Sequence, residues 1–319
     1  MQPETMLAIA NFHTIYDVRV VEEALEKSRK IEGLGTIHER MLKKQGRRLL
    51  TTPSSIKCVD ELDDDCPHFR AVTATVRKAI ALSLDGRETA TFTPALFLGK
   101  SGIGKTYYAQ RLARLLGTDF AFIPMNNMTA GWVLSGSSSQ WKNAKAGKVA
   151  TALIDGQNAN PVFVVDEIDK AGGDQRYDPL NPLYTLLEQE TSGRFVDEFV
   201  EIEIDASWAT WFFTANKLLI PDALLNRMRV FEIPEPTNEE MAGIADRLYR
   251  KILSQHTWKF ESEPRKNVVS KLSRLLPRAL YFTLIDAFGT AKYDGRDYLT
   301  PEDIRPQDDN NSHMGFVSN

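Results

Sequence analysis

The 319 residues of this chain exceed what one hydrophobic core usually serves, so we expect two or three domains. Hydrophobic residues make up 42% and charged residues 26%, which is the composition of an ordinary soluble globular protein. The net charge of −4 does not favour a nucleic-acid or an acidic-membrane partner. No apolar run approaches the roughly 18 residues of a membrane span, and the amino terminus has no signal-peptide core. We therefore expect a cytoplasmic protein without a membrane partner.

Residues 1–59 are predicted to form a helical region. Apolar residues recur at helical spacing between Val18 and Ser28, and a second helix is expected to pass through Met41 and Leu42. Basic residues near its end are interpreted either as a solvated helix face or as a nucleic-acid contact; they are Lys43, Lys44, Arg47 and Arg48. A further helix is predicted over residues 68–84.

Short apolar runs alternate with helical or loop stretches after residue 94. They cover residues 95–98, 120–123, 161–165, 208–213 and 229–233. This alternation predicts an α/β domain over residues 60–234, in which a parallel sheet has helices on both faces. The strands then stop. Residues 235–305 are predicted to form a small helical domain, and residues 306–319 a flexible polar tail.

Residues 99–106 read GKSGIGKT and lie between the first of these strands and a predicted helix. Glycines lack a Cβ, so the backbone can turn its N–H groups toward phosphate oxygens, and the helix points its positive end at the same place. Lys105 is expected to reach the β- and γ-phosphates, and the Thr106 hydroxyl to hold Mg²⁺. The loop predicts a nucleotide site formed by Gly99, Ser101, Gly102, Ile103, Gly104, Lys105, Thr106 and Tyr107.

Two carboxylates, Asp166 and Glu167, follow the apolar run VFVV. Because the carboxyl ends of parallel strands meet at one edge of a sheet, we expect both to lie beside the phosphate loop. Asp166 is expected to bind Mg²⁺ through its water shell, and Glu167 to polarise a water for attack on the γ-phosphate. The predicted reaction is Mg²⁺-dependent hydrolysis of ATP to ADP and phosphate.

The segment WFFTANKLLIPDALLNRMRVFEI, residues 211–233, has the order of elements found in the AAA+ ATPases. About residues 60–305 resemble the ATPase module of Lon proteases, which implies a P-loop NTPase sheet followed by a helical lid. The resemblance implies that Asn216 positions the attacking water and that Arg227 is the arginine finger of a neighbouring subunit, with Arg229 as the alternative. It also implies that Arg278, in LLPRAL, is a second sensor on the γ-phosphate, and that the chain forms a ring, expected to be a hexamer.

In the Lon-like pattern an aromatic residue and an aliphatic one lie on a loop that faces the central pore of the ring. Trp141 falls at the aromatic position, and Lys142 departs from the aliphatic one. A tryptophan can bind any side chain of a threaded polypeptide. A basic residue next to an aromatic residue, however, also suits binding to a nucleic-acid backbone. A core or partner-facing tryptophan is the alternative, but the polar neighbours favour an exposed loop. A second pore loop is expected at residues 171–179.

We therefore expect a chaperone-like, ring-forming ATPase that remodels or threads a protein substrate, alone or with a partner protein. No Ser–Lys protease domain follows the lid in this sequence, so no intrinsic proteolysis is expected. The alternative is a DNA-associated AAA+ regulator of the transposition or defence type. It would bind nucleic acid through the basic cluster at residues 43–48 or through Lys142, Lys145 and Lys148, and the acidic net charge weighs against it.

Overall fold

The computed structural model describes residues 9–29, 31, 33–86, 89–126, 128, 130–172 and 178–305. These residues form two compact units. The first contains the described residues up to Asp60, together with Ala71–Gly99 and Lys105–Ile233, and the second contains Glu61–Arg70, Lys100–Gly104 and the described residues from Pro234 on. The expected tail and residues 173–177 of the expected second pore loop lie outside the described residues.

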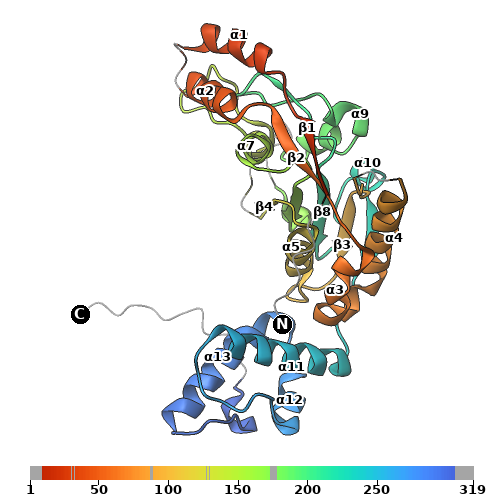
Figure 1. Cartoon of the computed structure of the whole chain (residues 1–319), viewed down its shortest axis with the longest axis vertical. Coiled ribbons are helices and arrows are strands. Elements are labelled where there is room, and N and C mark those ends of the chain that lie inside the picture. Colours follow the sequence, from red (N-terminus) through yellow and green to blue (C-terminus); the bar gives the residue numbers. More distant parts are fainter. Residues whose placement is uncertain are drawn as a thin grey trace, which may run out of the picture. The chain divides into compact units, whose positions relative to one another are not determined.

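The first unit is built on a five-stranded parallel sheet with the strand order β4-β5-β8-β3-β9 (Figure 1). The strands are β3 (Ala95–Leu98), β4 (Phe120–Pro124), β5 (Val162–Asp166), β8 (Thr210–Ala215) and β9 (Arg229–Glu232). Each overlaps one of the predicted apolar runs, so the α/β prediction is confirmed. Because β8 lies between β3 and β5, the residues that follow these three strands meet at one edge.

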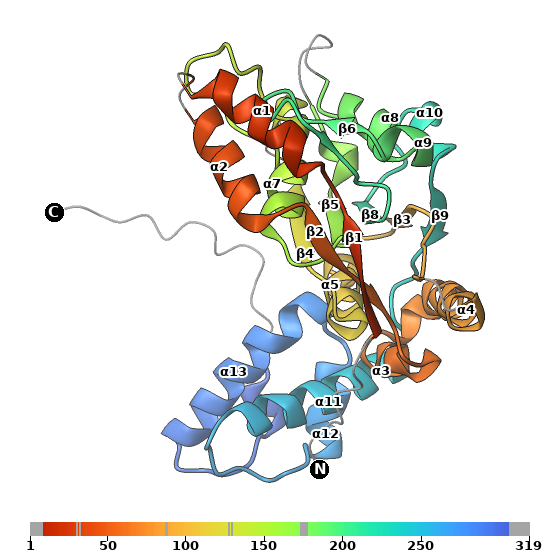
Figure 2. The ribbon, with the colours of Figure 1, turned by 45° about the horizontal axis from the view of Figure 1, so that its top comes forward.

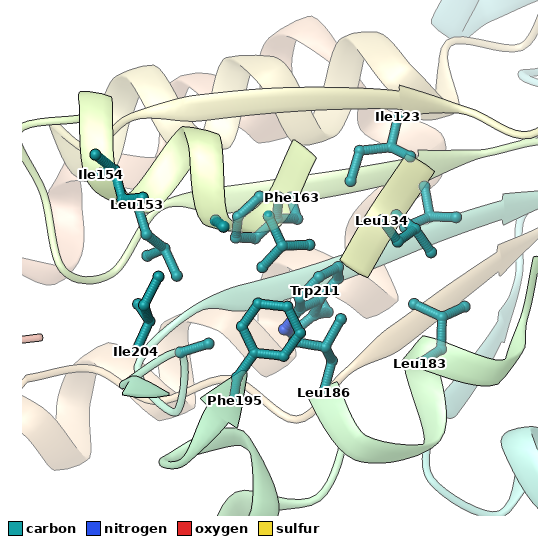
Figure 3. Close-up of a cluster of buried hydrophobic side chains, with 14 of the residues drawn as sticks. Ile123, Leu134, Leu153, Ile154, Phe163, Leu183, Leu186, Phe195, Ile204 and Trp211 are labelled. Carbon is teal, nitrogen blue, oxygen red and sulfur yellow. The ribbon is translucent and has the colours of Figure 1, made fainter. Parts of the chain in front are cut away.

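Aromatic side chains cover the two faces of this sheet. On one face, Phe97 stacks on Phe212 and meets Tyr108 of helix α5 (Lys105–Leu116) edge-on. On the other, Trp211 stacks on Phe163 at a ring distance of 4.5 Å. Figure 3 shows this second face packed against apolar side chains from α7 (Lys148–Asp155), α8 (Asn181–Leu186) and the strands β6 (Phe195–Val196) and β7 (Glu203–Ile204). Side chains alternate across a strand, so the central strands β3, β5 and β8 are buried on both faces.

The amino-terminal region differs from the prediction. It does contain two helices, α1 (Val18–Ser28) and α2 (Leu34–Lys44), but they lie between two strands, β1 (Ile9–Thr14) and β2 (Arg47–Thr52), that pair antiparallel (Figure 2). The strands are absent from the sequence prediction because each is short and is stabilised by a partner more than thirty residues away in the chain, from Ile9↔Thr52 to Thr14↔Arg47.

Strand β2 also joins the sheet unit. Its Leu49 exchanges backbone hydrogen bonds with Gln157 and Ala159. Arg48 is only 4% exposed, and its guanidinium donates to the carbonyls of Leu153 and Ile154 at the end of α7. A cation at the carboxyl end of a helix satisfies its last carbonyls, so Arg48 has a structural role there and is not part of an open basic face.

The remaining helices of the first unit are α4 (Arg70–Gly86, whose first residue belongs to the second unit), α6 (Trp132–Ser135), α9 (Gln189–Ser192) and α10 (Asp222–Leu225). The second unit is helical: α3 (Glu61–Asp65) and then α11 (Asn238–Gln255), α12 (Lys266–Leu272) and α13 (Pro277–Tyr293). Its core includes Tyr249 and Phe288, whose rings lie 5.0 Å apart. Among the described residues, no helix combines the length and apolarity needed to cross a membrane.

Candidate nucleotide site

The phosphate loop turns at two glycines. Gly102 and Gly104 have φ angles of 82° and 96°, a region that side-chain-bearing residues rarely adopt. A Cβ built on Gly104 would meet nothing within 4 Å, so the backbone angle and not space requires glycine there. The chain enters helix α5 at Lys105, so the loop ends at a helix N-terminus, the geometry that binds phosphate.

Two residues of the second unit donate hydrogen bonds to backbone carbonyls of this loop. His68 Nε2 donates to the carbonyl of Ile103 at 2.8 Å, and burial lowers the pKa of His68 because it disfavours the charged imidazolium. The backbone N–H of Arg278 donates to the carbonyl of Gly102 at 3.2 Å. The contribution of His68 is not apparent from the sequence, since it lies 35 residues before its partner and belongs to no motif.

The other predicted contact residues of the loop have different environments. Ser101 is exposed, and Tyr107 is also exposed on the first turn of α5. Ile103, in contrast, has a fully buried side chain, so only its backbone can face a ligand.

Lys105 connects two strands of the sheet. Its Nζ donates to the carbonyl of Gly99 at 2.6 Å and to Oδ1 of Asn216 at 2.9 Å. The side chain is 8% exposed, and this burial lowers the pKa of Lys105 while the nearby carboxylates of Asp166 and Asp169 oppose the shift. The predicted phosphate-binding lysine and the predicted sensor asparagine are thus in direct contact.

Asp166 receives two hydroxyl hydrogen bonds on one oxygen. Thr106 Oγ1 donates to Asp166 Oδ1 at 2.7 Å, and Thr214 Oγ1 donates to the same atom at 2.8 Å. The Thr214 hydroxyl also accepts from the backbone N–H of Glu167 at 2.9 Å. Thr214 therefore fixes both carboxylate-bearing residues against β8, a role that the sequence prediction did not include.

The segment after β5 continues the network. Asp169 Oδ2 accepts from the backbone N–H groups of Asn216 and Lys217, and Asp169 Oδ1 is buried without a hydrogen-bond partner among the described residues. Glu167 has left-handed backbone angles of φ 55° and ψ 48°, and its Oε1 lies 2.6 Å from Nζ of Lys170. This hydrogen bond raises the pKa of Lys170.

The donor set fits magnesium. A threonine hydroxyl and an aspartate carboxylate are the hard oxygen ligands that Mg²⁺ prefers, and Mg²⁺ commonly takes its other ligands from water and phosphate. Among the described residues no group of three or more His, Cys, Asp or Glu side chains could hold a metal by itself. Thr106 and Asp166 could therefore hold the ion only together with water or a nucleotide.

Arg227 lies outside this network, just past α10. Its Nε is 2.7 Å from Oε1 of Glu188, and its guanidinium lies 5.6 Å from the centre of the Tyr184 ring. Arg229 begins β9, where its guanidinium covers the ring of Phe231. The structure therefore holds Arg227 by a carboxylate next to α8 and α9.

Trp141 lies on an exposed loop. It is 50% exposed, and its ring meets that of Trp132 edge-on at 5.8 Å. Trp132, at the start of α6, is 38% exposed, and Lys142 is also exposed. The sequence prediction named Trp141 and Lys142 for this loop and did not include Trp132, because no motif links Trp141 to a residue nine positions upstream.

Sequence comparisons identify relatives of the sheet unit. Residues 95–235 match the model of the ATPase family associated with various cellular activities, abbreviated AAA. Lon proteases from Syntrophus aciditrophicus and Dictyoglomus thermophilum are 36% and 37% identical over 188 and 150 residues, which cover 58% and 47% of this chain. The chain spans only 24% and 19% of the length of these two relatives.

Solved structures give the same fold. Two variants of RuvB from Thermotoga maritima superpose with TM-scores of 0.51 and 0.50, each over 74% of this chain and 67% of theirs. Their sequence identity is 16%, so this similarity concerns the fold alone. Together with the parallel sheet and the phosphate loop, the comparisons show that residues 95–235 belong to the AAA family of ATPases and are related to the ATPase region of Lon proteases.

Proposed function

We propose that this chain hydrolyses ATP to ADP and phosphate in the presence of Mg²⁺. One observation carries the proposal: the hydrogen bonds that join Lys105 to Asn216 and Thr106 to Asp166 at adjacent strand ends. These side chains come from three separate segments of the chain, and they have the types that phosphoryl transfer requires. A turn with only a structural role would not need a buried lysine and two hydroxyls around one carboxylate.

Each residue has a role in this reaction. The backbone N–H groups of residues 102–106 and the Lys105 ammonium bind the phosphates, and Thr106 and Asp166 hold the metal, which neutralises phosphate charge. Glu167 orients the attacking water and accepts its proton, and Asn216 holds that water in line. The Asp169 carboxylate fixes Asn216 through its backbone N–H.

Arg227 and Arg278 complete the proposed site. We assign Arg227 as the arginine finger of a neighbouring copy in a ring, expected to be a hexamer, because the motif places it there and Glu188 holds it near the protein surface. Arg278 is assigned as the second sensor, supported by the backbone hydrogen bond that it makes to Gly102 of the phosphate loop. An arginine at the transferring phosphoryl group accelerates well-studied NTPases by about 10³–10⁵.

The proposed substrate is a protein, remodelled or threaded by the ring without proteolysis by the residues of this sequence. The exposed Trp141, beside Trp132, provides a surface that binds side chains without sequence preference. The alternative nucleic-acid partner has less support, because Arg48 of the basic cluster is buried and Lys44 donates to the carbonyl of Asp155.

ATPase rates of the wild type and of Glu167→Gln test the proposal. Each is measured alone, with an unfolded protein, and with duplex DNA at two salt concentrations. We expect Mg²⁺-dependent ATP hydrolysis that the unfolded protein stimulates. Glu167→Gln is expected to lower the ATPase rate by about 10²–10⁴-fold and still to bind ATP. Stimulation by DNA alone, falling steeply with salt, would instead favour the nucleic-acid partner. Absence of ATPase activity in the wild type would refute the proposal.

A further inference from the structure

The loop that carries Trp141 closes on itself at a narrow neck, formed by Gly136 and Gly147. Gly136 has a φ of 80°, and a Cβ there would overlap the carboxylate of Asp197. A Cβ on Gly147 would overlap the carbonyl oxygen of Leu134 and the backbone nitrogen of Gly136. The two ends of the loop therefore touch, and no side chain larger than glycine fits at either end without movement.

Asp197 fills this neck with a buried carboxylate. It is 0% exposed, and its Oδ2 accepts from the backbone N–H of Gly147 at 2.7 Å. Its Oδ1 accepts from the backbone N–H groups of Phe199 and Val200 at 3.0 and 3.1 Å. A single side chain thus joins the end of the loop to the turn between β6 and β7, and hydrogen bonds to a carboxylate are among the stronger ones in proteins.

The turn on which Asp197 sits is anchored in the core. Phe195, Val200 and Ile204 from this hairpin are all buried, and Figure 3 shows Phe195 and Ile204 in the same cluster as Trp211 and Leu134. The hairpin then leads into β8, the strand that ends at Ala215, next to the Asn216 of the proposed ATPase site. Asp197 therefore lies on a hairpin that is packed into the core of the first unit.

Further contacts join the loop and the hairpin. The backbone N–H of Glu198 donates to the carbonyl of Ser135 at 2.7 Å, and Ser139 donates to a carboxylate oxygen of Glu201. Within the loop, Ser137 and Lys145 are bonded across its two limbs. Trp141 belongs to the segment between these two residues and is half exposed. The loop is thus braced on one side by the β6–β7 hairpin.

We propose that Asp197 is the positioning residue for the Trp141 loop, and that its carboxylate makes the loop and the β6–β7 hairpin move as one body. The hairpin then determines where Trp141 is presented to an unfolded polypeptide. This inference rests on the proposed function for the identity of the bound polypeptide, but the physical coupling of loop and hairpin does not.

Limited trypsin digestion of the full chain tests the coupling directly, because Lys142 and Lys145 lie in the loop. Asp197→Asn keeps the volume but places an amide NH₂ against one set of backbone N–H groups. We expect cleavage at Lys142 and Lys145 to become about tenfold faster or more, since proteolysis follows the population of the opened segment. Gly136→Ala adds a Cβ that would overlap the Asp197 carboxylate, and it is expected to give the same result.

Glu198→Gln is the matched control, because it removes an exposed carboxylate from the residue next to Asp197. It is expected to leave the cleavage rate unchanged. If Asp197→Asn and Gly136→Ala fold and are cleaved in the loop no faster than the wild type, the positioning role is wrong.

A kinetic readout separates positioning from a general loss of stability. Asp197→Asn is expected to keep basal ATPase activity within about twofold, whereas the concentration of unfolded protein that gives half-maximal stimulation rises by about tenfold. Equal losses in basal and stimulated activity would contradict the inference. If instead Trp141→Ala keeps full stimulation, the proposed function fails at this loop, while the digestion result still decides whether Asp197 holds it.

Discussion

The Nζ atom of Lys105 donates a hydrogen bond to Oδ1 of Asn216 at 2.9 Å, although the two residues are 111 positions apart in the sequence. The bond joins the start of α5, which follows β3, to the residue after β8, and β3 and β8 are neighbours in the sheet. Burial lowers the pKa of Lys105, and both the amide oxygen of Asn216 and a phosphate oxygen can accept a hydrogen bond from its ammonium group. Lys105, the predicted phosphate-binding residue, and Asn216, the predicted sensor, therefore lie side by side.

Replacement of Lys105 by alanine tests this location. Lys105→Ala is expected to weaken ATP binding by about 10- to 150-fold, because a hydrogen bond to a charged group contributes about 1.5–3 kcal/mol. Titration with a fluorescent ATP analogue measures the loss. Lys100→Ala is the matched control, a lysine of the same loop that pairs with Glu235, and it is expected to retain most of the affinity. Equal affinities of Lys105→Ala and wild type would contradict the assignment.

The arginine finger is tested by mixing inactive copies. Arg227→Ala is expected to lower ATPase activity by up to about 10³–10⁵, as is usual for this group. A mixture of Arg227→Ala with Lys105→Ala should regain activity, because sites with an intact Lys105 then face copies with an intact Arg227. The control Arg229→Ala is expected to stay active. A mixture that assembles and remains inactive would show that Arg227 does not act between copies.

The hydroxyl of Thr214 is expected to matter as much as the motif residues. Thr214→Val removes the donor to Asp166 and the acceptor for the Glu167 N–H, and it leaves both polar groups without that partner. We expect a loss of about 1–3 kcal/mol in the free energy of unfolding, measured with urea, together with reduced ATPase activity. Thr210→Val, at the other end of the same strand, is the control and should leave the ATPase rate nearly unchanged. Normal activity in Thr214→Val would rule out its role.

Stability should depend on pH through Asp197. Burial raises the pKa of Asp197 to about 6, and the three backbone N–H groups that donate to it only partly oppose this shift. The folded state then binds a proton on Asp197 more tightly than the unfolded state does. The stability that this proton contributes is therefore fully present below about pH 4, and it is lost as pH rises through about 6.

Protonation of Asp197 changes the free energy of unfolding by about 3 kcal/mol in total, and about 1–1.5 kcal/mol of this change falls between pH 5 and pH 7.5. Urea unfolding at these two pH values should show the wild type losing that amount relative to Asp197→Asn. A wild type and an Asn variant with the same pH dependence would mean that Asp197 does not titrate in this range.

Local patterns were enough to predict the five strands of the sheet and the position of the phosphate loop between β3 and α5. The central strands β3, β5 and β8 are short, mainly apolar runs, because both faces of the sheet are covered there. The loop GKSGIGKT needs its glycines for its own backbone angles, which no distant residue can change. The carboxylates of Asp166 and Glu167 come at the end of an apolar run, so their place at the edge of the sheet could also be predicted from the sequence.

The tertiary structure decided which distant segments meet. Neither the pairing of Ile9–Thr14 with Arg47–Thr52 nor the burial of Arg48 against the end of α7 leaves a mark in the local hydrophobic pattern. The same holds for Thr214 between Asp166 and Glu167, and for Asp197 in the neck of the Trp141 loop. In each case a polar group is satisfied by a partner tens of residues away, and only the folded chain brings the two within hydrogen-bond distance.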